Sequence, residues 1–229
     1  MTKIRAAVCH TFGDPLAIED VIIAPPEGRA VEVTLEACAI CHSDISYADG
    51  IWGGALPAVY GHEAAGRITA AGDQVQGYAT GDKVIVTLIR SCGACAPCAG
   101  GTPTGCETPG GPQPLTTANG TSLHAAMNCG AFAERVVVDQ SQLAKVPEDL
   151  PADVASLLSC GVITGVGAVV NAAKLRPGQD AVVIGAGGVG LNAIQGARIA
   201  GARSIVAVDI SDEKLADAAS FGATDGILA

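Results

Sequence analysis

The stretch that most constrains the fold is the run from Ile184 to Gly190, which contains the glycine pattern GxGxxG. It directly follows an apolar run, Asp180 to Ile184, which predicts a buried strand, and it precedes Val189 to Ala200, whose apolar spacing predicts a helix. Glycines at a strand-to-helix turn allow a tight bend and bring a dinucleotide's phosphates close to the helix N-terminus, whose N–H groups attract anions. The turn therefore predicts cofactor binding by five residues: Gly185, Gly187, Gly188, Val189 and Gly190.

The pattern repeats after this turn. Ser204 to Val208 predicts a second strand, Asp212 to Ser220 a second helix, and Gly226 to Ala229 the opening of a third strand. Asp209 ends the second strand, where its carboxylate can accept hydrogen bonds from ribose hydroxyls and repel a 2′-phosphate. We therefore expect NAD in preference to NADP. The alternative is a glycine-rich turn that binds nothing.

The segment from Lys3 to about Pro147 has a different residue pattern, with short β-like runs broken by Gly and Pro. Three runs predict strands, and the Gly-, Pro- and Thr-rich segment from Ala99 to Asn128 predicts an irregular loop. The predicted strands are Val31 to Glu36, Lys83 to Leu88, and Glu134 to Val138. Pro151 to Leu158 predicts a helix start. The chain is thus mixed α/β, with a barrel-like β-rich first part and a βαβα second part.

Four cysteines lie close together at Cys92, Cys95, Cys98 and Cys106, separated by Gly, Ala and Pro. Four thiolates fill a tetrahedral zinc site completely, so such an ion has a structural role. The alternatives are an iron–sulfur cluster or a zinc-ribbon module that binds nucleic acid. A formal net charge of -10 argues against nucleic acid, because phosphate binding needs clustered Lys and Arg.

A second set of metal donors is spread along the chain. Cys41-His42-Ser43-Asp44 is followed, eighteen residues after Asp44, by His62-Glu63. With Cys160 as a third ligand, Cys41 and His62 would hold a catalytic zinc whose fourth position is open to water or substrate. The alternative for each of these residues alone is ordinary core packing. Cys9, Cys38 and Cys129 are left over, and we interpret them as small buried hydrophobic residues.

No apolar run approaches the roughly 18 residues of a membrane span without a glycine or a charge interrupting it. The N-terminal segment has no apolar core of the kind a signal peptide needs. We therefore expect a cytoplasmic protein with no membrane or nucleic-acid partner.

Taken together, these residues resemble the zinc-containing medium-chain alcohol dehydrogenase family. The resemblance covers nearly the whole chain, and five segments carry it: Cys41 to Asp44, Gly61 to Gly66, the four cysteines, Cys160-Gly161, and the glycine turn with Asp209. It implies a chaperonin-10-like catalytic domain at 1–165 and a truncated Rossmann domain, a doubly wound parallel sheet, at 166–229. The implied reaction is hydride transfer from a small-molecule alcohol to NAD, giving an aldehyde or ketone.

The resemblance also implies residue roles. Cys41, His62 and Cys160 would bind the catalytic zinc, with Glu63 and Asp44 beside them, and the four-cysteine cluster would hold the structural ion. His42 would lie near the cofactor pyrophosphate, Thr164 near the nicotinamide and Lys214 near the ribose. Ser43 would pass on the alcohol's proton; its alternative role is that of a helix cap, and both roles could hold at once. Many relatives continue this relay with a histidine where the chain has Ser46, so proton release here is expected through water.

Trp52 and Leu88 fall where relatives line the alcohol pocket, although ordinary packing explains them equally well. The substrate stays open, and a thiol-linked formaldehyde dehydrogenase is the nearest alternative. A non-catalytic fragment that binds zinc and nucleotide is the alternative from another class. Because two βα units leave much apolar surface uncovered, we expect a C-terminally truncated chain that is weakly stable and inactive in this form. The full-length form would be a homodimer or homotetramer, as is usual in the family.

Overall fold

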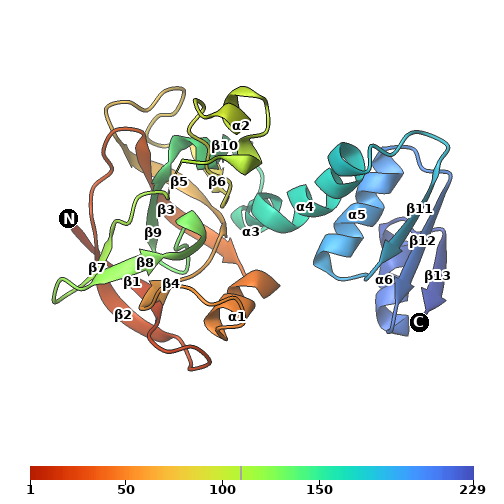
Figure 1. Ribbon diagram of the computed structural model, residues 1–229, viewed down its shortest axis with the longest axis horizontal. Coiled ribbons are helices and arrows are strands. Elements are labelled where there is room, and N and C mark those ends of the chain that lie inside the picture. Colours follow the sequence, from red (N-terminus) through yellow and green to blue (C-terminus); the bar gives the residue numbers. More distant parts are fainter. Residues whose placement is uncertain (109) are drawn as a thin grey trace. The chain divides into compact units, whose positions relative to one another are not determined.

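The computed structural model describes residues 1–108 and 110–229, and the chain divides into two compact units, Met1–Ser159 and Cys160–Ala229. The first unit is rich in β-strands and the second alternates strands and helices (Figure 1). The domain boundary expected from the sequence, between residues 165 and 166, lies six residues beyond this division.

The strands of the first unit are β1 (Thr2–Cys9), β2 (Ala17–Ile23), β3 (Ala30–Ala39), β4 (Ala58–Val59), β5 (Glu63–Ala71), β6 (Lys83–Val86), β7 (Leu115–Thr117), β8 (Ser122–Ala125), β9 (Arg135–Asp139) and β10 (Leu143–Lys145). Its α-helices are α1 (His42–Ala48), α2 (Ala96–Ala99) and α3 (Ala152–Leu157). Three 3₁₀ turns complete it: η1 (Pro103–Gly105), η2 (Ala126–Asn128) and η3 (Gln140–Gln142).

Five strands close into a barrel in the order β1-β2-β7-β8-β4. Strand β1 shows how the barrel fills its interior, because successive side chains of a strand point to opposite faces. Ile4, Ala6 and Val8 are buried, whereas Lys3 and Arg5, on either side of Ile4, are exposed. The inward side chains pack with those of β2, β7 and β8 in one hydrophobic cluster.

The expectation of an irregular loop from Ala99 to Asn128 is wrong for part of that segment. Strands β7 and β8 lie there as an antiparallel pair, with Leu115 opposite Leu123. Both leucines are buried in the barrel, and their burial stabilises two strands that are too short to show a clear period in the sequence. The rest of the described part of the segment consists of turns, short helices and irregular backbone.

The second sheet of this unit has the order β10-β6-β5-β3-β9. All three strands predicted for it are present, as β3, β6 and β9, with bounds shifted by a few residues. The antiparallel pairing of β3 with β5 sets Ala39 opposite Glu63. Cys41 follows the end of β3 and His62 precedes the start of β5, so this register holds the two at the same end of the sheet.

A long helical segment begins with α3 and continues through two π-helical turns, η4 (Leu158–Val162) and η5 (Ala168–Ala172), on either side of α4 (Ile163–Gly167). The helix predicted to start at Pro151 is confirmed, with Pro151 at the N-cap. By length and apolar composition alone, Ala152–Ala172 would suit a membrane span. This is weak support for a membrane role, since helices of protein cores have the same properties, and Ala155 packs against Ala65 and Ile85.

The second unit holds a parallel sheet in the order β11-β12-β13, made of β11 (Asp180–Ile184), β12 (Ser204–Asp209) and β13 (Asp225–Leu228). Helices α5 (Gly188–Ile199) and α6 (Asp212–Phe221) connect the strands and pack against them (Figure 1). Buried Ile194, Ala197, Ile205, Ala207 and Ala218 form the core between helices and sheet. The predicted βαβα order is confirmed.

One expectation about this sheet is wrong. The run from Asp180 to Ile184 was expected to be buried, but Val182 is 64% and Ile184 83% exposed. The cause is that α5 and α6 contact one another and the sheet, so only the side chains on their side are covered. The register sets Ile184, Val208 and Ile227 in a row on the other side.

Candidate functional site

Three candidate metal donors of the first unit lie together at the end of the β3–β5 pair. The ligand atoms of Cys41, His62 and Glu63 are all within 4.8 Å of one another. Gly61 helps to place His62: its φ of +93° suits glycine, and a Cβ there would lie 2.6 Å from the backbone nitrogen of Phe132. The donors therefore meet because of strand register and a turn that only glycine can make.

Asp44 organises this group from the first turn of α1. Its Oδ1 accepts hydrogen bonds from the backbone N–H of Gly61 and from Nδ1 of His62, each at 3.0 Å, and its Oδ2 accepts from the N–H of Cys41 at 3.0 Å. Asp44 and His62 are both buried. A carboxylate that bonds Nδ1 in this way orients the imidazole ring, as is typical of metal-binding histidines.

Cys160 is the first residue of the second unit and lies in the π turn η4. Its Sγ is 3.9 Å from Oγ1 of Thr164, which is exposed. The residue before it, Ser159, belongs to the first unit and is fully buried there, with Oγ donating to the carbonyl of Ala64 at 3.3 Å. Ala64 lies two residues after His62 in the same unit.

The remaining candidate residues of the segment Cys41 to Asp44 lie on α1. His42 is the first residue of the helix and is exposed, and Ser43 follows it, partly exposed. The N-cap is Cys41, so the alternative that Ser43 caps the helix is wrong. Ser46, at the position where the resemblance leads one to expect a relay histidine, is buried.

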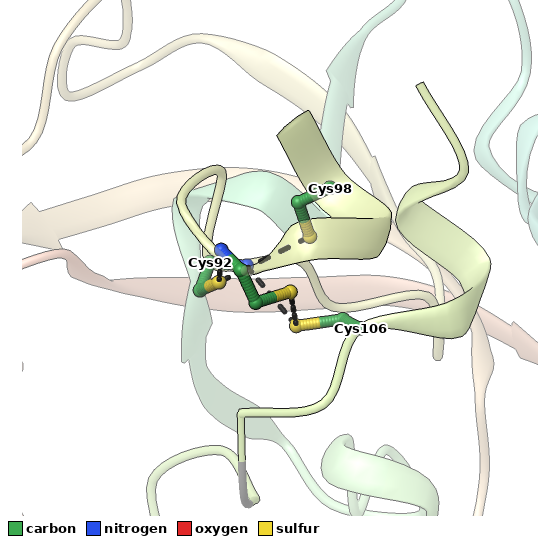
Figure 2. Close-up of side chains that lie close together, drawn as sticks. Cys92, Cys98 and Cys106 are labelled. Atoms are coloured by element: carbon green, nitrogen blue, oxygen red, sulfur yellow. Dashed lines mark hydrogen bonds between the residues drawn. The ribbon is translucent and has the colours of Figure 1, made fainter. Parts of the chain in front are cut away.

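The four-cysteine cluster forms a second group of donors, in which the four sulfurs lie within 4.8 Å of one another. Sγ of Cys92 is 4.0 Å from that of Cys98, and Sγ of Cys95 is 3.9 Å from that of Cys106; Figure 2 shows the labelled sulfurs turned toward one another. Zn–S bonds of about 2.3 Å in a tetrahedron imply sulfur separations of roughly 3.8 Å. The spacing therefore fits a closed zinc site.

Hydrogen bonds prepare part of this cluster for cation binding. The Thr108 side chain and the N–H groups of Ala94 and Cys95 lower the pKa of Cys92 to about 5, which favours the thiolate that a metal requires. Hydrogen bonds from the backbone of Thr108 and Cys92 also lower the pKa of Cys106. Burial raises the pKa of Cys98 to about 11, in the opposite direction to the shifts of Cys92 and Cys106.

The interpretation of the leftover cysteines is confirmed. Cys9 and Cys129 are buried, and Cys38 is partly buried and packs against the same core cluster as Cys129. Burial, together with the carboxylates of Asp44 and Glu63, raises the pKa of Cys38 to about 12. These are thiols of the core, and they lie outside both groups of metal donors.

The glycine turn has the geometry expected of a nucleotide site. Gly185 has a φ of +92°, nothing lies within 4 Å of a Cβ built on Gly187 or Gly188, and α5 begins at Gly188. Asp209 is buried at the end of β12, where its carboxylate accepts from the N–H of Ala186 at 2.8 Å and of Ser211 at 3.1 Å. The Ala186 bond is the main reason that the pKa of Asp209 is lowered. Val189 is the second residue of α5, and Lys214 is exposed on α6.

Trp52 and Leu88 line different hollows of the first unit. Trp52, 55% exposed, meets Tyr47 edge to face with ring centroids 5.1 Å apart, in a cavity of about 330 Å³ also lined by Tyr60 and Met127. Leu88 lines a hollow of about 220 Å³ beside Cys106. A larger hollow, about 560 Å³, lies between β1, β3 and Phe132 and is lined by none of the predicted site residues.

Two family models match the chain. The model described as alcohol dehydrogenase GroES-like domain matches residues 27–148, more than half of the chain, and the model described as zinc-binding dehydrogenase matches residues 188–229. Together with the observed fold, these matches confirm the predicted fold class.

Solved structures give the same result. An alcohol dehydrogenase zinc-binding domain protein from Burkholderia ambifaria is 38% identical over 99% of this chain, with a TM-score of 0.94. A benzyl alcohol dehydrogenase from Acinetobacter calcoaceticus is 33% identical over 100%, with a TM-score of 0.91, and an NAD-dependent alcohol dehydrogenase is 30% identical over 98%, with a TM-score of 0.83. The chain spans 64%, 64% and 63% of the lengths of these proteins.

Proposed function

Because this chain belongs to the zinc-type alcohol dehydrogenase family, we propose that its site residues serve the oxidation of a small alcohol by NAD. The observation that carries the proposal is the group formed by Cys41, His62 and Glu63, with Asp44 orienting the imidazole. A thiolate and an imidazole with a carboxylate-bound N–H are the donors of a catalytic zinc site.

We propose Cys160 as the further thiolate, and the four-cysteine cluster as the holder of a separate structural ion. When bound at the Cys41 site, zinc supplies Lewis-acid polarisation, which makes an alcohol hydroxyl more acidic. Ser43, partly exposed in the first turn of α1, then accepts that proton and releases it to water. Buried Ser46 has no ring nitrogen with which to extend the relay.

The glycine turn supports nicotinamide binding by the second unit. The open space above Gly187 and Gly188 gives the pyrophosphate access to the N-terminus of α5, where unpaired N–H groups favour an anion. The lowered pKa of Asp209 keeps its carboxylate ionised at neutral pH, which suits a ribose hydroxyl and repels a 2′-phosphate. We therefore propose NAD as the preferred cofactor, with His42, Thr164 and Lys214 as further contacts.

The test combines metal content with cofactor binding on purified chain. We expect two zinc ions per chain and tighter fluorescence-detected binding of NADH than of NADPH. Cys41→Ser should remove one ion, and any NADH formed from ethanol, benzyl alcohol or cyclohexanol should disappear with it. Cys106→Ser should release the other ion.

Cys9→Ser is the matched control, because Cys9 is a buried thiol outside both donor groups whose bond to the Thr11 carbonyl serine can keep. It should retain both ions. A wild-type chain that binds a single ion, or a Cys41→Ser variant that keeps two, would refute the catalytic zinc site.

A further inference from the structure

One face of β6 runs along helix α3 and holds it at three points. Side chains two residues apart on a strand share a face, as Lys83 and Ile85 do on β6, and Thr87 follows at the same spacing directly after the strand ends at Val86. Nζ of Lys83 donates to the carbonyls of Glu148 at 3.1 Å and Leu150 at 2.5 Å, just before the helix. Ile85 packs against Ala155. These two contacts fix the start and the middle of α3.

The third contact lies just beyond α3, in the π turn η4. Oγ1 of Thr87 donates to the carbonyl of Ser159 at 2.8 Å, and Oγ of Ser159 donates to the carbonyl of Ala64 at 3.3 Å. Ser159 thus joins β6 to β5 in the first unit, on the residue that directly precedes Cys160. We call these two bonds the Thr87–Ser159 clamp.

The clamp is itself held rigidly. Nε2 of Gln142, which is fully buried, donates to the carbonyl of Thr87 at 2.9 Å, and the N–H of Thr87 donates to the carbonyl of Gln142 at 2.9 Å. The Gln142 side chain also accepts from the N–H of Asp139 at 3.2 Å. Thr87 is therefore fixed by backbone bonds to η3, so its hydroxyl has a defined place.

We infer that Thr87 and Ser159 are positioning residues that set the Cys160 thiol at the catalytic metal. This inference rests on the proposed function. Helical residues turn by about 100° per position, so a slip of one residue would point the thiol elsewhere, whereas metal–ligand distances vary by only about 0.2 Å. The π turn at Leu158–Val162 departs from the regular α-helical hydrogen-bond ladder at this place, and side-chain bonds can hold the local geometry.

The test compares three variants for zinc affinity, measured by competition with a chromogenic chelator, and for the visible spectrum after cobalt substitution. Thr87→Val keeps the side-chain shape but removes the hydroxyl, and it should lower the binding affinity for one of the two zinc ions roughly tenfold or more. It should also change only the cobalt bands of that ion. Thr87→Ser keeps the hydroxyl and should restore wild-type affinity. Thr34→Val, which removes an exposed threonine bond on β3, is the matched control.

Selective loss of one ion in Thr87→Val, with rescue by serine, supports the clamp. Wild-type affinity for both ions, or equal weakening of both, overturns it. Should Thr87→Val fail to fold by circular dichroism, Ser159→Ala decides the question: it keeps the carbonyl that Thr87 binds, and must still weaken one ion selectively. A wild-type chain that binds only the four-cysteine ion refutes the proposed function. Because the inference rests on that function, the same result refutes the inference.

Discussion

At the scale of single residues, Asp44 decides the state of the metal donors. One carboxylate accepts three hydrogen bonds, from His62 and from the backbone of Cys41 and Gly61. It thereby orients the imidazole of the histidine and ties the two donor segments together. A single buried side chain controls both the chemistry and the geometry of the site.

We predict that Asp44→Asn weakens zinc binding at this site by about 10- to 100-fold, as loss of a partner to a metal-binding histidine typically does. The amide has one acceptor oxygen, and its NH₂ group faces an N–H donor, so a bond is lost as well. Unfolding free energy should fall by about 1–3 kcal/mol. Chelator competition and urea unfolding measure the two effects.

Asp49→Asn is the control, since Asp49 is exposed at the other end of the same helix. It should leave zinc affinity and stability unchanged. If Asp44→Asn binds zinc as the wild type does, the carboxylate is not what orients His62.

At the scale of elements, three of the four glycines from Ile184 to Gly190, in the strand–turn–helix unit, are needed for three different reasons. Gly185 adopts a positive φ. A Cβ on Gly190 would lie 1.8 Å from the carbonyl oxygen of Gly185, so this glycine is needed for close packing. Gly187 has an ordinary φ of -80° and open space around it, which indicates that its missing side chain makes room for a ligand.

We predict opposite results for alanine at two of these positions. Gly190→Ala should destabilise the second unit by about 1–3 kcal/mol, the usual cost of overpacking, because backbone atoms must move. Gly187→Ala should keep the wild-type melting temperature but bind NADH about tenfold more weakly or worse, since the methyl group occupies the space of the pyrophosphate. Thermal unfolding and NADH fluorescence separate the two.

Gly13→Ala is a control for a glycine outside the turn: it lies in a surface loop of the first unit with a positive φ, so it should cost stability without affecting NADH. Undiminished NADH affinity in Gly187→Ala would show that no phosphate approaches this turn.

At the scale of the whole molecule, the two units carry different ligand chemistry. The four-cysteine cluster and the Cys41–His62 donors belong to the first unit, and the glycine turn with Asp209 belongs to the second. A ligand that binds only the native state of a unit stabilises that unit in proportion to the logarithm of its concentration.

We therefore predict two calorimetric unfolding transitions with different responses. Loss of the four-cysteine ion should lower the unfolding temperature of the first unit, and NADH at about 100 times its dissociation constant should raise the free energy of unfolding of the second unit by about 2.7 kcal/mol. Cys106→Ser identifies the first transition and Gly190→Ala the second. A single transition that responds to both ligands would mean that the units unfold as one cooperative body.

Much of this arrangement was predictable from short segments. The glycine turn and the four-cysteine cluster each lie within a few residues, so local backbone geometry brings their atoms together and spacing is a sufficient signal. The strands and helices with clear periods were predicted for the same reason. The hairpin of β7 and β8 was missed because it is short and is stabilised by burying Leu115 and Leu123 in a barrel formed by distant strands.

The approach of Cys41 to His62 depends on more than spacing. It follows from a strand register, Ala39 opposite Glu63, that no periodicity specifies, and from the turn at Gly61. Likewise nothing in the residue pattern marks Thr87 and Ser159, whose bond joins positions 72 residues apart. The sequence by itself determines which residue types are present and how closely they are spaced, and these indicate the chemistry of the site. The tertiary structure decides which distant residues meet, because long-range strand pairing depends on burial of the whole core and brings the distant donors within reach of one ion.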